Sequence, residues 1–298
     1  MNVTICIPTF RRPALLSALL RSLERLCFAK VREPRISIVV VDNDANGSAA
    51  HSLRTFDSSR FEIGYRIETQ PGISYARNTC IRAAGPSDFI AFIDDDETAS
   101  PTWLDELLNA QRAFDAPIVA GPIVPHYETQ PPAWLITGGF HQRRRYATGT
   151  TVASTSAGNV LVARRVFERL TPPWFDLQFA RSGGEDTHFF RRCATFGFPV
   201  TWANDAIAYE EIPDERSTPD YLLRRARDGG NHWTRVDLAL QVPLYRLALR
   251  MAAGVARIAQ GYASAALGPL LSPSQRLQNA MRAAEGVGNL SAFLGREF

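Results

Sequence analysis

The feature that most constrains this fold is a run of five apolar residues, 89–93, that leads directly into four carboxylates, Asp94 to Glu97. A short apolar run of this kind is typical of a β-strand buried on both faces. The four acids cannot follow the strand into the core, because burying an unpaired charge is prohibitively costly. The pattern predicts a strand that ends either at a solvated acidic turn or at a site for a divalent cation carrying phosphate.

Apolar runs and amphipathic segments alternate through the first hundred residues. The pattern predicts strands at 3–7, 36–41, 65–68 and 89–93, with helices at 13–26, 49–56 and 74–84 between them. This alternation indicates an α/β fold, a mostly parallel sheet covered by helices on both faces. Ligands of such sheets bind beyond the carboxyl ends of the strands, where Asp42, Asp44 and the acids from Asp94 onward all fall. Two acidic strand ends at one edge favour the cation site.

The second half of the chain is less regular. The pattern predicts helices at 102–114, 164–169 and 187–196, strands at 118–120, 159–162 and 200–202, and a long loop or mixed excursion at 122–153. Tyr209-Glu210-Glu211 is interpreted as an acidic turn. Residues 242–271 carry three arginines at roughly helical intervals. They fit either an amphipathic helix in a membrane interface, with its arginines toward the headgroups, or a helix packed on its own domain.

Composition narrows the class of protein. The chain has 298 residues, enough for one large domain or one domain with an appendage, and its formal net charge of +3 gives no case for nucleic acid. The four cysteines lack metal-ligand spacing and are interpreted as small buried residues in a reducing cytoplasm. The chain opens on a predicted strand rather than a signal peptide, and no window is apolar enough to predict a membrane-spanning helix.

Five short motifs occur in one order along the chain. They are Ile7-Pro8-Thr9-Phe10-Arg11-Arg12-Pro13, Val41-Asp42-Asn43, Ala76-Arg77-Asn78, Phe92-Ile93-Asp94-Asp95-Asp96 and Gly184-Glu185-Asp186. Together they resemble family 2 glycosyltransferases with the GT-A fold, and the chain looks most similar to bacterial succinoglycan-type exopolysaccharide glucosyltransferases. The resemblance implies a glycosyltransferase domain at 1–232, with a nucleotide-sugar half at about 1–100 and an acceptor half at about 101–232. A helical C-terminal extension at 233–298 would follow, as a candidate for membrane association.

The resemblance also implies a donor site. The residues expected at the nucleotide sugar are Pro8, Thr9, Arg11, Asp42, Arg77, Asn78, Asp94 and Asp95. Asp96 is expected to hold Mn2+ or Mg2+. Tyr209 stands where many relatives have a histidine ligand, so either Glu210 completes the metal shell or the metal keeps an extra water. Alternation along an extended segment would place Asp94 and Asp96 on one side and Asp95 on the other, which makes Asp95 the least certain of the three.

The remaining implied roles concern catalysis and the acceptor. The acceptor hydroxyl must lose a proton as it attacks, so a carboxylate base is required, and the resemblance favours Asp186 over Glu185. The residues expected at the diphosphate are Arg224, Arg227 and His232, and those expected at the acceptor are Trp134, Asn159 and Trp174. For the arginines, a solvated helix face or a lipid-headgroup patch is the alternative. Arg143-Arg144-Arg145 is interpreted as a solvated loop in preference to an acceptor contact.

These roles describe an inverting, metal-dependent hexosyltransferase. The resemblance implies a UDP-sugar donor, UDP-glucose first, a lipid-linked saccharide acceptor and a peripheral location on the inner face of the cytoplasmic membrane. A sugar-nucleotide nucleotidyltransferase is the alternative enzyme, but its Gly-rich loop is missing after the first strand, where 8–13 contain no glycine. A catalytically inactive sugar-nucleotide or glycan-binding protein is the other alternative, and the intact acids Asp42, Asp94, Asp96 and Asp186 argue against it.

Overall fold

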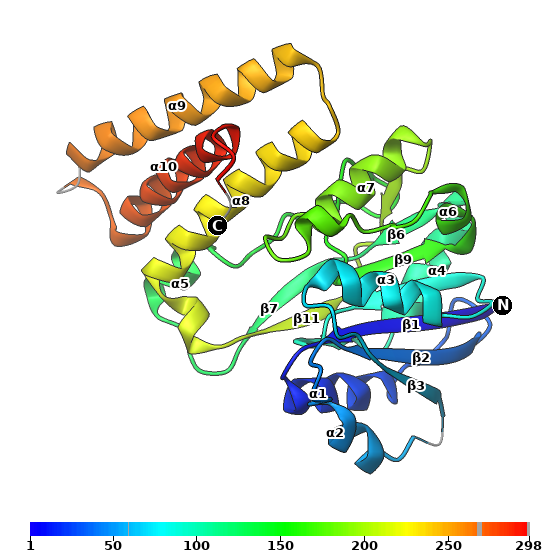
Figure 1. The fold of residues 1–298 in the computed structure, drawn as a ribbon. Coiled ribbons are helices and arrows are strands. Elements are labelled where there is room, and N and C mark those ends of the chain that lie inside the picture. The colour runs from blue at the N-terminus through cyan, green and yellow to red at the C-terminus, as the bar shows by residue number, and fades with distance from the viewer. Residues whose placement is uncertain (59, 267–269, 297–298) are drawn as a thin grey trace. The chain divides into compact units, whose positions relative to one another are not determined.

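The computed structural model describes residues 1–58, 60–266 and 270–296 (Figure 1). The chain forms two compact units, the first from Met1–Val124 and Arg143–Glu210, the second from Pro125–Gln142 and Glu211–Phe298. The chain enters the second unit twice, at Pro125 and at Glu211. Neither position coincides with the predicted boundary at residue 232. The assignment of 1–232 as the glycosyltransferase domain stays a prediction.

An eight-stranded sheet forms the centre of the first unit. Its strands are β1 (Asn2–Thr9), β2 (Arg35–Asp42), β3 (Glu62–Ile67), β4 (Phe89–Ile93), β6 (Ile118–Ala120), β8 (Thr151–Val152), β9 (Asn159–Ala163) and β10 (Val200–Trp202). They are ordered β3-β2-β1-β4-β9-β6-β10-β8. Strands β1 to β4 run parallel, whereas β9 is antiparallel to both β4 and β6. The predicted mostly parallel sheet is confirmed, and the carboxyl ends of β1, β2 and β4 share one edge.

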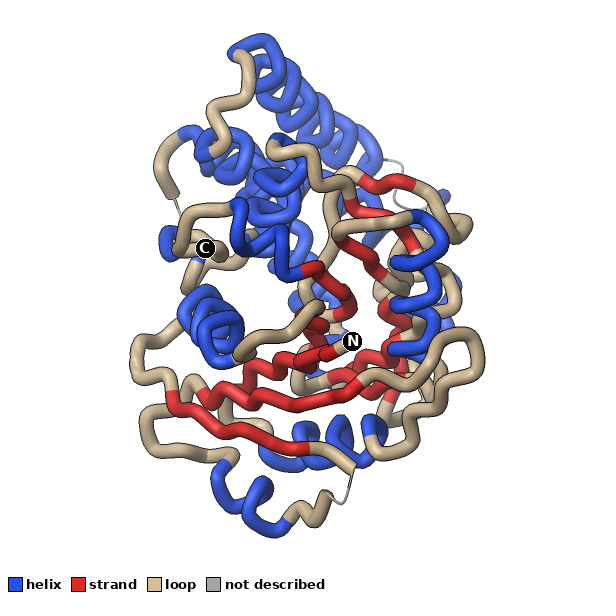
Figure 2. The backbone as a smooth tube through the Cα atoms, turned by 90° about the vertical axis from the view of Figure 1, so that its right-hand side faces the viewer, coloured by secondary structure: helices blue, strands red, loops and turns tan. Residues whose placement is uncertain are grey.

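Helices cover both faces of this sheet (Figure 2). Those of the first unit are α1 (Pro13–Leu23), α2 (Ala50–Thr55), α3 (Ile73–Ala83), α4 (Trp103–Phe114), α6 (Arg164–Arg169) and α7 (Glu185–Thr195), with a 3-10 turn, η1 (Leu177–Phe179). Because side chains alternate along a strand, Ile5 and Ile7 join one core with Leu20, while Cys6 joins the other with Phe189. The two cores fix the strand ends on which the site is built.

A second, three-stranded sheet is ordered β5-β11-β7, from Glu97–Ala99, Ala208–Ile212 and Ile123–Tyr127. The predicted acidic turn at Tyr209-Glu210-Glu211 was wrong, because this stretch lies inside β11. Glu210 pairs with Glu97 of antiparallel β5, and Tyr209 pairs with Thr98. Strand pairing brings two acids together here, a long-range effect that local sequence does not report. The predicted excursion at 122–153 holds β7, the short helix α5 (Ala133–Gly138) and β8.

The second unit is built from α5, the 3-10 turn η2 (Asp214–Ser217) and three long helices, α8 (Pro219–Ala239), α9 (Leu244–Ala266) and α10 (Pro273–Phe293). Glycines let α10 approach its neighbours closely: a Cβ on Gly230 of α8 would lie 2.2 Å from the Glu285 carbonyl oxygen, and one on Gly286 would lie 2.5 Å from that of Gly254. Within the described ranges, we find no helix with the length and apolarity needed to cross a membrane.

Candidate active site

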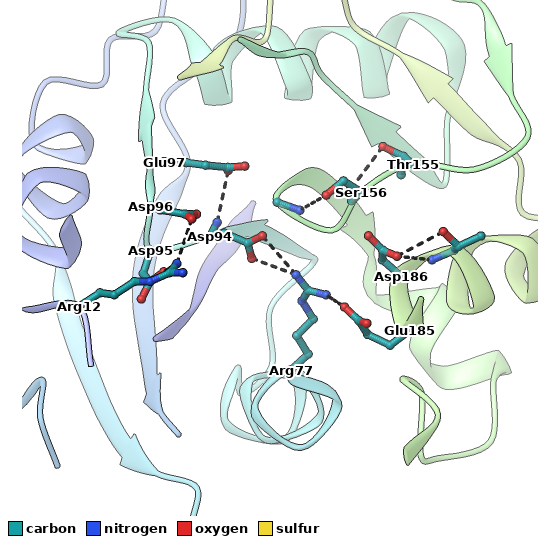
Figure 3. Close-up of polar contacts among 12 residues, drawn as sticks. Arg12, Arg77, Asp94, Asp95, Asp96, Glu97, Thr155, Ser156, Glu185 and Asp186 are labelled. Carbon is teal, nitrogen blue, oxygen red and sulfur yellow. Dashed lines mark hydrogen bonds and ion pairs between the residues drawn. The ribbon is translucent and has the colours of Figure 1, made fainter. Parts of the chain in front are cut away.

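Arg12 binds the middle of the acidic segment that follows β4 (Figure 3). Its Nη1 lies 3.0 Å from Asp95 Oδ1 and 2.9 Å from Asp96 Oδ2. The Thr9 hydroxyl at the end of β1 donates to Asp95 Oδ2 at 2.8 Å. Burial raises the pKa of Asp95 to about 6, and Arg12 acts in the opposite direction. The predicted extended alternation was wrong: the chain turns at Asp95 and Asp96, and both share Arg12.

Arg77, on α3, connects two motifs that are far apart in sequence. Its side chain is 4% exposed, its Nη2 lies 3.0 Å from Asp94 Oδ1, and its Nη1 donates to Glu185. Burial lowers the pKa of Arg77, but the two carboxylates outweigh it and the net pKa is raised. The guanidinium therefore stays charged. Arg77 thereby joins the end of β4 to the start of α7. Removing either carboxylate would leave the buried guanidinium without one of its partners, which is costly.

Helix α7 begins with two carboxylates in different environments. Gly183 and Gly184 precede it with φ values of 78° and 92°, a left-handed backbone that glycine adopts without steric cost. Burial raises the pKa of the Glu185 carboxyl to about 7, against the opposing charge of Arg77. Asp186 is only half-buried, and its Oδ1 accepts a 2.6 Å hydrogen bond from the Thr187 amide. Of the two acids, Asp186 is the one that Arg77 does not bind directly.

Further carboxylates flank Asp94 on the side of the small sheet. Glu97 is 3% exposed, and burial, followed by the negative charge of Asp94, raises its pKa well above the usual range. Gly158 lies against both: a Cβ there would be 2.5 Å from Glu97 Oε1 and 3.0 Å from Asp94 Oδ2. Arg143 Nη2 lies 2.6 Å from Glu210 Oε2. The interpretation of Arg143 as part of a solvated loop was therefore wrong, since it is the cation on this side of the cluster.

The arrangement fits a divalent cation that arrives with a phosphate. Within the described part of the chain, no group of three or more His, Cys, Asp or Glu side chains forms a metal site on its own. Mg2+ needs fewer, because one or two carboxylates and substrate phosphates commonly hold it. The acids nevertheless crowd one another: Asp94, Glu210 and Asp96 all raise the pKa of Glu97. A cation would relieve that repulsion, with Asp96 exchanging Arg12 for the metal.

Asp42, at the end of β2, is 0% exposed and is held by its own chain. It accepts hydrogen bonds from the Ala49 amide at 2.7 Å, the Tyr65 hydroxyl at 3.0 Å and the Asp44 amide at 3.0 Å. Asp44 in turn binds Arg11 at 3.1 Å. A contact between Asp42 and the nucleotide stays a prediction. The structure shows a carboxylate that shapes the turn after β2.

Three other predicted site residues form hydrogen bonds that stabilise the loops around the site. Asn78 exchanges two hydrogen bonds with the Phe175 backbone, at 2.7 and 3.1 Å. Asn159 is 1% exposed, and its amide donates to two backbone carbonyls and accepts from Trp103 Nε1 at 2.8 Å. Trp174 donates to the Phe167 carbonyl at 2.8 Å. These three support the loops around the site, and their predicted ligand contacts stay predictions.

Four predicted residues belong to the second unit. Arg224, Arg227 and His232 lie on α8, where Arg227 binds Asp228 at 3.1 Å. Trp134 lies on α5, 5.7 Å from the ring of Phe140. Their roles toward the diphosphate and the acceptor stay predictions. Arg12, by contrast, contacts the acidic cluster but was given no role from the sequence, although it stands inside a quoted motif, which is the signal that could have identified it. Arg143 was considered only for a solvated loop or the acceptor, and it contacts Glu210 instead.

Comparisons with known proteins identify the family of the chain. The model of glycosyl transferase family 2 matches residues 4–171, and that of glycosyl transferase family group 2 matches residues 89–275. Succinoglycan biosynthesis protein ExoM of Rhizobium meliloti (strain 1021) is 32% identical over 297 residues, 99% of this chain and 94% of the relative. Glucosyl-dolichyl phosphate glucuronosyltransferase of Haloferax volcanii is 27% identical, over 76% of this chain and 74% of its own.

Solved structures share the fold at low sequence identity. The mannosyltransferase PcManGT from Pyrobaculum calidifontis, in complex with GDP-Man and Mn2+, has a TM-score of 0.64 at 20% identity, covering 99% of this chain and 88% of that one. TarS 1-349 of S. aureus, in complex with UDP-GlcNAc, has a TM-score of 0.55 at 15% identity, covering 99% and 93%. The expected GT-A fold is confirmed. The chain belongs to glycosyl transferase family 2 and is a glycosyltransferase.

Proposed function

We propose that this glycosyltransferase moves a hexose, glucose first, from a UDP-sugar to a lipid-linked saccharide with inversion of the anomeric centre. The observation that carries the proposal is the Arg77 bridge, which holds Asp94 of the donor motif beside the carboxylates of α7. Asp94 of the donor motif and the two candidate bases of α7, Glu185 and Asp186, are therefore near one another, which supports a single active site. Membership of the family removes the nucleotidyltransferase alternative.

The donor half of the proposal rests on Asp94 and Asp96. A bound Mn2+ or Mg2+ would supply positive charge to the departing nucleoside diphosphate. In this chain Asp96 is the ligand proposed for the metal and Asp94 the residue proposed for the sugar or ribose. In the structure Asp96 pairs with Arg12 at 2.9 Å. Glu210 is the second metal candidate, but it must first release Arg143.

The acceptor half rests on the start of α7. We assign the base to Asp186 because Glu185 is engaged by the buried Arg77. Burial raises the pKa of Glu185 to about 7, a value that would suit a general base, so the assignment to Asp186 rests on the Arg77 contact and not on the pKa. A base that deprotonates the acceptor hydroxyl permits direct displacement, which inverts the anomeric carbon without a covalent enzyme intermediate.

The proposed acceptor class is suggested by the names of two relatives, and the proposed location follows from a lipid-linked acceptor. One is named for succinoglycan biosynthesis, and another for transfer to a glucosyl-dolichyl phosphate. We therefore propose a lipid-linked acceptor met at the inner face of the cytoplasmic membrane. Arg224, Arg227 and His232 are proposed to approach the diphosphate, and Trp134 the acceptor.

The test is a variant that separates binding from transfer. Sugar nucleotides are screened for thermal stabilisation with Mn2+, and turnover is then measured as nucleoside diphosphate released with lipid extract from an exopolysaccharide-producing bacterium. Asp186→Asn should bind donor as the wild type does and lose turnover by about 1,000-fold, within the usual range for a general base. Glu185→Gln is the matched control. Near-normal turnover in Asp186→Asn would transfer the role of base to Glu185.

A further inference from the structure

Two of the three arginines of helix α9 turn toward the neighbouring helices. Arg250 pairs with Asp237 of α8, and Arg257 Nη2 lies 3.5 Å from Glu285 Oε1 of α10. Of the two alternatives that the sequence left open, the packing of these two arginines fits a helix packed on its own domain, whereas Arg246 is exposed. Acids on α8 and α10, 13 and 28 residues away, draw the arginines to the packed side. Figure 1 shows α9 lying along α10 within the second unit.

The opposite side of α9 is apolar and exposed. We define the α9 face by its six large residues, Leu244, Tyr245, Leu249, Met251, Val255 and Tyr262, which are 83%, 60%, 65%, 44%, 55% and 77% exposed. Exposed alanines fill the spaces between them, and the sequence of α9 contains no Asp or Glu. At 1.5 Å per residue, the face is about 27 Å long. Exposed apolar surfaces of this continuity mark interaction sites.

The α9 face is too small to be the binding surface for a second copy of this chain. One helix face about 27 Å long and 10 Å wide offers roughly 270 Å2, estimated from ordinary helix dimensions. A stable protein interface buries about 800 Å2 on each partner. A lipid surface has no such minimum, because an interfacial helix binds through its own buried apolar area and attraction to anionic lipids.

The charges around the face favour an anionic lipid surface. Helices α9 and α10 together carry five arginines and one acid, Glu285. Arg246 lies beside the face, with its Nε 3.2 Å from the Tyr245 hydroxyl, where a headgroup phosphate would meet it. Tyr245 and Tyr262 stand near the two ends, and tyrosine is enriched at membrane–water boundaries.

We propose that the α9 face inserts into the surface of an anionic lipid bilayer while Arg250 and Arg257 fasten the helix to α8 and α10. The proposal deepens the membrane association proposed above, on which it rests. It differs from the sequence-based alternative in the partners of Arg250 and Arg257, which are acids of α8 and α10 instead of lipid headgroups. Vesicle binding tests it without reference to sugar transfer, so failure here leaves donor binding and turnover to be judged separately.

The experiment is co-sedimentation of the full chain with phosphatidylcholine vesicles that contain 0 or 30% phosphatidylglycerol. In Val255→Asp, a charge replaces an apolar group at the middle of the face, so the fraction bound to anionic vesicles should fall at least about tenfold. Val287→Asp is the matched control, because Val287 is an exposed valine on α10, 45% exposed and outside the face. It should bind as the wild type does.

Three outcomes would overturn the proposal. They are wild-type protein that does not bind anionic vesicles, equal binding by Val255→Asp, and sedimentation equilibrium that shows a wild-type dimer dissociated by Val255→Asp. Far-UV circular dichroism verifies that the variants are folded. If Val255→Asp is not, Leu244→Asp replaces it, since an acid at the start of a helix is favourable there. Thermal stabilisation by the sugar nucleotide, measured without vesicles, should be the same in every variant.

Discussion

Asp42 at the end of β2 and the acids at the end of β4 lie on the same edge of one sheet, yet their negative charges are balanced by different partners. At the end of β2, Asp42 is buried and accepts hydrogen bonds from backbone amides and the Tyr65 hydroxyl. At the end of β4, the acids meet guanidinium groups instead: Arg77 binds Asp94, and Arg12 bridges Asp95 and Asp96.

The difference distinguishes a carboxylate with a structural role, Asp42, from one whose partner can be replaced, Asp96. Neutral donors that belong to a turn cannot leave without breaking the turn, so Asp42 is committed to the fold. An arginine side chain, in contrast, can be exchanged for another cation. Arg12 is 39% exposed and holds Asp96 from the solvent side, which leaves room for such an exchange. The negative charges of Asp94, Glu210 and Asp96 all raise the pKa of the buried Glu97, so an added cation would be favourable here.

The largest effect should come from exchanging one acid at each strand end. Asp96→Asn should weaken Mn2+-dependent binding of the nucleoside diphosphate about 100-fold, a loss typical of a metal site, because the amide cannot replace the anionic ligand. Asp44→Asn is the matched control at the end of β2, where the acid binds Arg11. It should leave the Mn2+ dependence unchanged. Calorimetric titration with and without Mn2+ measures both, and equal losses in the two variants would remove the distinction between the strand ends.

The second test addresses stability at the end of β2. Asp42→Asn keeps the shape of the side chain but replaces one acceptor oxygen with a donor that faces other donors. We expect the free energy of unfolding to fall by about 2 kcal/mol, the usual cost of an unsatisfied buried group. Urea denaturation measures the change, with Asp44→Asn as the less buried comparison. A stable Asp42→Asn protein that has lost donor binding would return Asp42 to the ligand site.

The sequence predicted the β4 site better than it predicted the contacts that hold it. Apolar runs locate β4 because burial on both faces requires an uninterrupted apolar strand. The pairing of Arg77 with Glu185 joins residues 108 positions apart, and no local pattern encodes it. Glu210 was assigned to a turn for the same reason, since its strand, β11, forms through pairing with the distant strands β5 and β7. The order of the five motifs, through the family resemblance, assigned Arg77, Asp94 and Glu185 to one site. The hydrophobic periodicity alone does not predict that these residues lie together.

The smallest effect, and the most specific, concerns Tyr65. Its hydroxyl donates to Asp42, and burial, followed by this bond, raises the pKa of Tyr65 from 10.0 to about 12. Tyr65→Phe should cost about 1 kcal/mol of unfolding free energy near neutral pH, the value of one hydrogen bond. Because the folded pKa is raised, the unfolded chain ionises first, so the contribution of Tyr65 is full below pH 10 and is lost as the pH rises toward 12.

The difference in stability between wild type and Tyr65→Phe should therefore shrink between pH 10 and about 12, where the folded tyrosine also titrates. Urea denaturation at several pH values measures it. Tyr262→Phe is the control, because Tyr262 is 77% exposed and its hydroxyl should contribute nothing at any pH. If wild type and Tyr65→Phe were equally stable at every pH in this range, Tyr65 would stabilise the fold through its ring alone. Asp42 would then be held by the backbone amides of its turn, and the contrast with β4 would rest on those amides.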